Sequence, residues 1–256
     1  MKRQLYDLTD EPFAMMINRV GTVLKKEGVK HNIVGGAAVQ SYIFYMLTKK
    51  YNKDICGLIY DPDVRIQDYI RSTDDIDLAL KLEEEEDTEK IRKINQFLPK
   101  FAFEEIAPCG EVIVEIRPER IGASRPTFKI YVDGKGSEDE IIAMNINRGK
   151  KGDIRNLEDH WYNKIIEESE ELVIPYTPNY ELRVVVPKLE HLLVEKIAGS
   201  RAKDLMDNKN LADLSKETGR ELDFKEMKSM LLPINERNYF RFLEAQYPKQ
   251  LNELGN

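Results

Sequence analysis

The chain has 256 residues, 41% of them hydrophobic and 33% charged, which is enough for one large domain or two unequal ones with a hydrophobic core. Its formal net charge of −7 at pH 7 argues against a protein that coats nucleic acid through a uniformly basic surface, and leaves room only for a local basic cleft. No run approaches the roughly 18 consecutive apolar residues of a membrane span, and the N-terminal run MKRQLYDLTDEPF lacks the apolar core of a signal peptide. The sequence therefore predicts a cytoplasmic protein with no membrane partner.

Cysteine and histidine spacing excludes several kinds of site. Cys56 and Cys109 have neither CxxC spacing nor a neighbouring histidine, so neither a zinc site nor a disulfide is expected. His31, His160 and His191 are scattered, and none stands in a Ser-His-Asp or Cys-His context. We interpret His191, on an apolar helical segment, as a packing or surface residue rather than a base.

The N-terminal part of the chain predicts a helix, a strand, a turn and a second helix. Thr9 and Asp10 are good N-cap residues, and apolar residues then recur at helical spacing as far as about Gly28. The run HNIVGGAAVQSYIFYML is a short apolar segment, interrupted by Gly35 and Gly36 and continued by helix formers. This order places both glycines at a turn between a strand and a helix.

A later segment, STDDIDLALKL, predicts a strand with two carboxylates on one face. Asp75 and Asp77 alternate with apolar residues. Carboxylate oxygens are hard ligands, so the pair can bind Mg²⁺ (or Mn²⁺) while the metal also contacts substrate phosphates. Backbone N–H groups at the Gly35–Gly36 turn can approach the same phosphates. Taken alone, such a carboxylate pair is more often a solvated strand face and a glycine pair a plain turn, but the two in this order favour a phosphate site.

The rest of the chain separates into strand-rich and helical parts. The pattern predicts a helix within residues 157–169 and a short strand ending at Pro187, and only helical spacing follows. We therefore predict an α+β fold, with a mixed sheet flanked by helices over residues 1–186 and an all-helical C-terminal domain over residues 187–256. The strand-like segments of the middle part are residues 101–107, 111–116, 127–132 and 140–147.

Polar residues in the C-terminal part recur at helical intervals. Lys196, Ser200, Lys203 and Asp207 are three or four positions apart, so in an unbroken helix they would share one face and offer cations to a triphosphate. Gly199 is a point at which that helix can break. The competing interpretation is an exposed, salt-bridged helix surface, which would be favoured without the upstream carboxylate pair.

Three patches of the sequence carry a resemblance to a known family. VGGAAV followed by RSTDDIDL resembles the signature of the DNA polymerase β-type nucleotidyltransferase superfamily. The arrangement Arg71-x-Thr73-x-Asp75-Ile76-Asp77 resembles its AbiEii/AbiGii toxin branch, and VPKLEHLLVEKIAGSRAKDLMD is similar to a later motif of that branch. The matching positions of the later motif are Lys196, Arg201, Lys203, Asp204 and Asp207.

The resemblance implies an enzyme that uses Mg²⁺ or Mn²⁺ to transfer an NMP from an NTP to RNA, such as tRNA, or to protein. It further implies the toxin half of a toxin–antitoxin pair, with a cognate antitoxin as partner. Asp75 and Asp77 would be the metal ligands, and Lys196 and Asp204 would join them as catalytic residues. The nucleotide-binding residues would be Gly35, Gly36, Thr73, Arg201, Lys203 and Asp207. Two alternatives remain: an enzyme that modifies small molecules such as antibiotics, and a degenerate module that binds nucleotide without turnover.

Two departures from the superfamily pattern bear on catalysis. Compact members keep the glycine pair close to the carboxylate pair, whereas here residues 49–70 form an insertion between them. The strand IIAMNINRG has Asn145 and Asn147 where a third carboxylate is expected, and an amide is a weaker, neutral ligand.

The sequence leaves the source of a third carboxylate open. Asp133 and Glu115 are possible substitutes, and a site with two carboxylates is an equal alternative. Without a third carboxylate, the usual general base for a hydroxyl nucleophile is missing as well.

Overall fold

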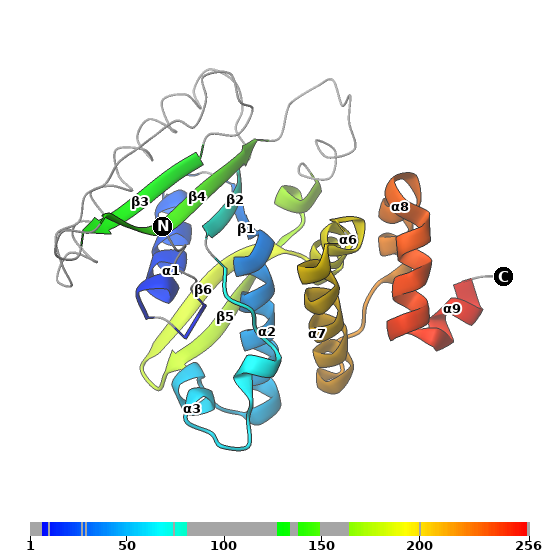
Figure 1. Ribbon diagram of the computed structural model, residues 1–256, viewed down its shortest axis with the longest axis horizontal. Coiled ribbons are helices and arrows are strands. Elements are labelled where there is room, and N and C mark those ends of the chain that lie inside the picture. Colours follow the sequence, from blue (N-terminus) through cyan, green and yellow to red (C-terminus); the bar gives the residue numbers. More distant parts are fainter. Residues whose placement is uncertain are drawn as a thin grey trace.

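The computed structural model describes residues 7–9, 11–26, 28, 30–73, 75–80, 127–133, 138–148, 164–199 and 201–254 (Figure 1). The strands expected at residues 101–107 and 111–116, together with Cys109 and Glu115, lie outside the described residues, and so do His160 and Ser200. None of the described helices combines the length and the apolarity that crossing a membrane would require.

Four strands form a mixed sheet, as expected. They are β1 (His31–Val34), β2 (Asp75–Leu80), β3 (Thr127–Asp133) and β4 (Glu138–Arg148). The order across the sheet is β1-β2-β4-β3, with β2 and β4 parallel and the other two pairs antiparallel. The strand with the two aspartates is therefore interior to the sheet, between β1 and β4.

A second, two-stranded sheet is the hairpin of β5 (Ser169–Thr177) and β6 (Tyr180–Pro187). The sequence predicts only β6 here. In β5, Leu172, Ile174 and Tyr176 are buried and alternate with more exposed residues, and Pro175 is one of the exposed positions. A proline within the segment argues against a strand when only the sequence is considered. Proline is tolerated because the sheet has only two strands, and the register shifts between Pro175 and Thr177. The two-stranded hairpin thus accommodates the proline that makes this strand hard to predict from the sequence.

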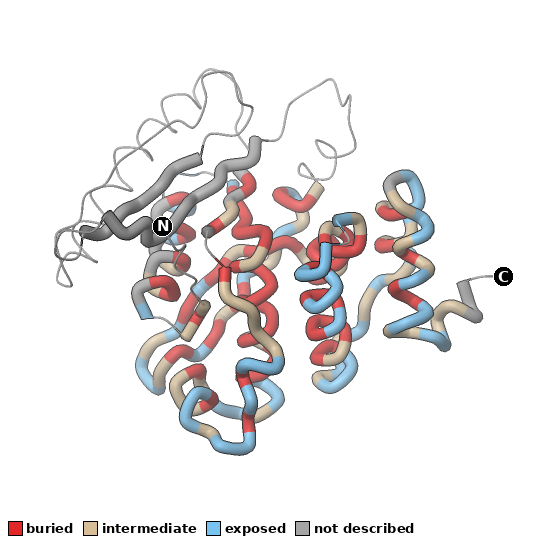
Figure 2. Tube along the Cα trace, in the orientation of Figure 1, coloured by how far each residue is buried: buried red, intermediate tan, exposed pale blue. Residues whose placement is uncertain are grey.

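The helix α2 (Gly35–Tyr51) is at the centre of the described core. It contacts β1, β2 and β5, and it lies beside α7 (Figure 1). Most of its length is buried (Figure 2), because neighbours surround it on several sides. Helix α1 (Glu11–Lys26) forms where the spacing of its apolar residues predicts a helix, and it covers β1 and β6.

The predicted insertion at residues 49–70 contains the end of α2, the short helix α3 (Ile55–Ile59) and a 3₁₀ turn at Ile66–Asp68. The Asp54 carboxylate caps α3 by accepting a hydrogen bond from the Gly57 N–H at 2.6 Å. The insertion is therefore ordered local structure that returns the chain to β2.

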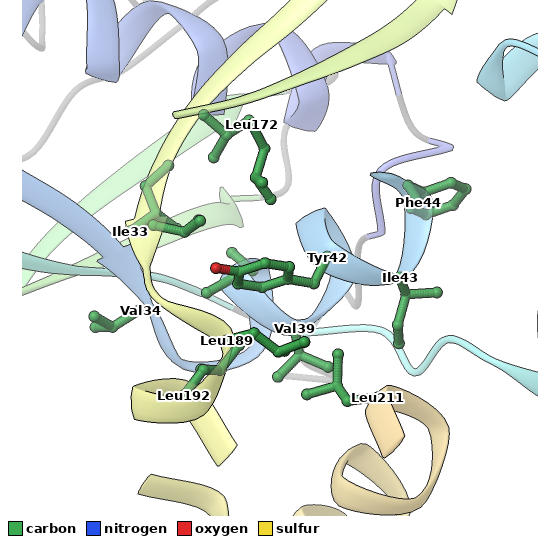
Figure 3. Close-up of a cluster of buried hydrophobic side chains, with 14 of the residues drawn as sticks. Ile33, Val34, Val39, Tyr42, Ile43, Phe44, Leu172, Leu189, Leu192 and Leu211 are labelled. Atoms are coloured by element: carbon green, nitrogen blue, oxygen red, sulfur yellow. The ribbon is translucent and has the colours of Figure 1, made fainter. Parts of the chain in front are cut away.

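After Pro187 the described chain is entirely helical, as predicted. The helices are α6 (Leu189–Gly199), α7 (Ala202–Thr218), α8 (Phe224–Gln246) and α9 (Pro248–Leu254). Helix α8 is kinked at Asn235, two positions after Pro233. Leu192 of α6 and Leu211 of α7 pack in the same cluster as Tyr42 of α2 (Figure 3), so the first C-terminal helices share the core of the preceding part.

Candidate functional site

The turn between β1 and α2 lies directly against Asp77. The β1–β2 register pairs Val34 with Asp77, and Gly35 follows Val34 as the first residue of α2. Gly35 has a φ of +66°, and a Cβ atom there would overlap Oδ2 of Asp77 and lie 3.2 Å from its Cγ. Both the backbone conformation and the close approach therefore require glycine. Val34 provides no side-chain cap, so the first N–H groups of α2 receive no oxygen from the N-cap residue.

The second glycine is in contact with the loop that leads into β2. A Cβ atom on Gly36 would lie 2.9 Å from Oγ1 of Thr73 and 3.5 Å from Nη2 of Arg71. Thr73 is buried, and Gln40, one turn further along α2, donates a hydrogen bond to the Arg71 carbonyl at 2.9 Å. The loop is thus held against the first turns of α2, and the structure brings Gly35, Gly36, Thr73 and Asp77 together.

Helix α7 holds the same loop from the other side. The Arg71 guanidinium donates two hydrogen bonds to Asp207, from Nε to Oδ1 and from Nη2 to Oδ2, both at 2.9 Å. The Asp207 side chain is 3% exposed and the Arg71 side chain 21%. Asn210 donates a hydrogen bond to the Tyr69 carbonyl at 2.7 Å. The described contacts of Asp207 are therefore with the loop preceding β2, a partner that the sequence does not indicate.

The predicted polar face around Lys196 does not form, because the helix breaks after Gly199. Helix α7 begins at Ala202, and the Asp204 carboxylate accepts a hydrogen bond from the Arg201 N–H at 3.1 Å, which caps the new helix. A Cβ atom on Gly199 would lie 2.8 Å from Oδ2 of Asp204. Lys203 is exposed on α7, whereas Lys196 is buried on α6.

The junction between α6 and α7 nevertheless gathers three of the predicted residues. Arg201 donates to Asp204 from Nε at 2.7 Å and from Nη2 at 3.0 Å, and Asp204 is fully buried. Burial acts to raise the pKa of Asp204, but the hydrogen bonds from Arg201 and the charge of Lys196 outweigh it and hold that pKa below its usual range. Lys196 is 1% exposed and donates to Oε1 of Glu195 at 3.1 Å. Lys196, Arg201 and Asp204 thus form a charged cluster one helical turn before Asp207.

Strand β4 places an asparagine beside Asp77. Asp77 is in register with Asn145 and Asp75 with Ala143, so Asn145 occupies the neighbouring-strand position expected for a third carboxylate. Asp133 is in register with Glu138, and the stretch from Glu138 to Asn145 spans roughly 20 Å of strand. The alternative that Asp133 replaces the missing carboxylate is therefore wrong.

A second cluster of titratable residues lies between α6, α8 and the residue just before β5. One ligand atom each of Glu168, His191 and Glu226 lies within 4.8 Å of the other two, a spacing at which they could bind a metal ion. His191 is fully buried, and its Nε2 lies 3.1 Å from Oε1 of Glu226. The sequence does not reveal this cluster, because its members come from three separate elements with no shared motif.

Two lysines already neutralise the carboxylates of this cluster. Lys164 Nζ lies 2.7 Å from Glu226 Oε1, and Lys188 Nζ lies 2.7 Å from Glu168 Oε2. Burial acts to raise the pKa of Glu226, but hydrogen bonds from Lys164 and His191 outweigh it and lower that pKa to about 2. We therefore interpret the cluster as an ion-pair network that joins α6 to α8.

Comparisons with known proteins add little to this geometry. A scan against protein-family models finds no match, and no curated protein matches the sequence. Among solved structures, the chain is similar to an antigenic nucleotidyltransferase-like protein from Paracoccidioides brasiliensis, at 14% identity, 95% coverage of this chain, 94% coverage of that chain and a TM-score of 0.44. A likeness at this TM-score assigns no function, so the function rests on the residues of the site.

The ion-pair network predicts acid-sensitive stability. The pKa of Glu226 in the folded protein, about 2, is below its ordinary value of 4.5. Its contribution to the free energy of unfolding is therefore complete above about pH 5 and is lost as the pH falls towards 2. Glu226→Gln should lower the free energy of unfolding by about 1–3 kcal/mol at pH 7, with a difference from wild type that shrinks in acid. Urea unfolding from pH 7 to pH 3 measures this. Glu236→Gln, exposed on the same helix, is the control, and a pH-independent difference for Glu226→Gln would contradict the interpretation.

Proposed function

We propose that this chain is a metal-dependent nucleotidyltransferase that transfers an NMP from an NTP to an RNA or protein acceptor. The observation that carries the proposal is the pairing of Val34 with Asp77, which sets the glycine start of α2 against the strand with the two aspartates. The N-terminus of a helix attracts phosphate through its N–H groups and its dipole. A triphosphate at this point would meet both the helix and the carboxylates.

Asp75 and Asp77 are the proposed ligands of Mg²⁺ or Mn²⁺. The fit rests on the donor type, since carboxylate oxygens suit both ions, and on Gly35, whose missing side chain leaves room for the Asp77 carboxylate at the helix start. When bound, the metal would neutralise phosphate oxygens and stabilise charge on the departing pyrophosphate. The chain itself would bind the phosphates through the α2 N–H groups at Gly35 and Gly36 and through Thr73.

The asparagine beside Asp77 sets an expectation for the rate. An amide side chain does not take up a proton at neutral pH, so Asn145 cannot act as general base for an attacking hydroxyl. General-base catalysis typically contributes about 100-fold or more. We therefore expect slow transfer compared with a site that has three carboxylates.

The charged cluster at the α6–α7 junction is the proposed source of further cations and of Asp204. Lys196 and Asp204 are buried, so their proposed catalytic role would be exerted through Arg201, while Arg201 and Lys203, both exposed, would contact the nucleotide and neutralise charge on the transferred group and the pyrophosphate. The position of the cluster supports this proposal, because Asp207, one helical turn after Asp204, pairs with Arg71, and Arg71 lies next to Gly36. We extend the proposal, from the resemblance to the AbiEii branch, to a toxin with a cognate antitoxin as partner.

A label-transfer assay tests the proposal. Purified protein is incubated with each of the four labelled NTPs, Mg²⁺ or Mn²⁺, and either total tRNA or cell protein. Wild type is expected to label one macromolecule, Asp75→Ala to label none, and the exposed loop variant Asp63→Asn to label as wild type does.

Two other outcomes would redirect the assignment. Nucleotide binding without label transfer to any acceptor would contradict the enzyme and favour the degenerate binding module. Transfer only to hydroxyl-bearing small molecules, such as aminoglycosides, would favour the small-molecule enzyme instead.

A further inference from the structure

The bond between Arg71 and Asp207 uses only part of the guanidinium. Nε and Nη2 each donate to one Asp207 oxygen at 2.9 Å, and Nη1 takes no part in this pair. Nη2 also lies 3.5 Å from the space that a Cβ atom on Gly36 would occupy. Arg71 is therefore oriented by α7 on one edge while it lies beside the first turn of α2.

Arg71 and Asp207 differ in how far their side chains are buried. Asp207 is 3% exposed, whereas Arg71 retains 21% exposure, so the carboxylate is enclosed and the cation is still partly accessible. A buried ion pair by itself contributes little net stability, because desolvation offsets the attraction. A planar guanidinium held by a carboxylate on one edge presents the N–H groups of its other edge in a defined direction, which suits a phosphate.

The backbone around Arg71 is held as well as its side chain. The Arg71 carbonyl accepts a hydrogen bond from Gln40 of α2, and the Tyr69 carbonyl accepts one from Asn210 of α7. Two helices thus determine where this short segment lies. A side chain fixed at both its backbone and its charged end loses little conformational entropy when it contacts a ligand.

We propose that Arg71 binds the terminal phosphates of the nucleoside triphosphate at the start of α2, and that Asp207 is the positioning residue that holds it there. This inference rests on the proposed function, because it names a further phosphate-binding group of the same site. It also changes the expected role of Asp207, which acts through Arg71 and does not touch the nucleotide. Selectivity for triphosphate over monophosphate is the property that Arg71 would supply.

Binding of nucleotides with three, two or one phosphate groups tests the inference without requiring turnover. For the base that wild type binds most tightly, dissociation constants of the NTP, NDP and NMP are measured with Mg²⁺ by calorimetry. Arg71→Gln is expected to weaken NTP binding by about 10- to 100-fold, the size of a lost charge-assisted hydrogen bond, and to leave NMP binding within about 2-fold. Asp207→Asn should shift NTP binding in the same direction by a smaller factor.

Matched variants separate positioning from general damage. Arg65→Gln, exposed in the same loop, and Asp213→Asn, on the same helix as Asp207, should bind every nucleotide as wild type does. Should Arg71→Gln fail to fold, Arg71→Lys keeps the charge opposite Asp207 and removes the planar fork. Inorganic tripolyphosphate should then displace a fluorescent NTP from this variant about 10-fold less effectively than from wild type.

The outcomes distinguish this inference from the function on which it depends. Equal weakening of NTP and NMP binding, or no change in either, would overturn the role of Arg71 and leave the nucleotidyltransferase proposal standing. Absence of NTP binding by wild type would overturn the proposed function, and the role of Arg71 with it.

Discussion

Replacing Asp77 by asparagine is expected to reduce nucleotide transfer by at least about 1,000-fold while the fold remains intact. The substitution keeps the size of the side chain at the start of α2 but removes the negative charge proposed to bind the metal. Transfer rates with a labelled NTP measure the loss, and circular dichroism and thermal unfolding report on the fold. Near-wild-type transfer by this variant would contradict the assignment of the metal site.

The same variant tests the proposed toxin role in cells. Expression of wild type should arrest growth, and Asp77→Asn should relieve the arrest at equal protein level. Asp63→Asn, in the exposed loop before β2, is the control and should arrest growth as wild type does. Equal arrest by Asp77→Asn would separate any toxicity from nucleotide transfer.

Gly35→Ala should be among the most damaging single-methyl changes in the described part of the chain. Its φ of +66° disfavours any residue with a Cβ, and the added methyl would overlap the Asp77 carboxylate. We expect a loss of about 2–4 kcal/mol in the free energy of unfolding, together with loss of NTP binding, because the first turn of α2 and Asp77 must separate. Urea unfolding and calorimetric NTP binding measure both effects.

Gly219→Ala is a matched control for this prediction. Gly219 ends α7 with a φ of +68°, but a Cβ atom there would meet nothing within 4 Å. Gly219→Ala should therefore lower the free energy of unfolding only by the backbone strain, about 1 kcal/mol, and leave NTP binding unchanged. The double change Gly35→Ala with Asp77→Ala should recover much of the lost stability, because the overlapping carboxylate is gone. Additive losses in the double variant would show that steric contact with Asp77 is not the cause.

Local patterns in the sequence predicted most of the described helices and strands. Apolar spacing indicates α1, alternation indicates β2, and the glycine pair indicates the junction of β1 with α2, because each of these depends on neighbouring residues. The sequence does not predict the hairpin strand β5, because the segment contains Pro175 and proline disfavours a strand. The sequence does not determine whether the helix breaks at Gly199, because the start of α7 depends on the cap formed by Asp204.

Residue patterns alone indicate that a glycine turn precedes a helix, that two aspartates occupy alternate positions of a strand, and that an asparagine stands where a third carboxylate is expected. Which of these residues come into contact depends on how the strands and helices pack. The register of β1, β2 and β4 brings Gly35 to Asp77 and sets Asn145 beside it. Arg71 pairs with Asp207, which is 136 positions later in the sequence, because the packing of α7 against α2 brings the two residues together. Such contacts depend on non-local packing, which residue spacing does not encode.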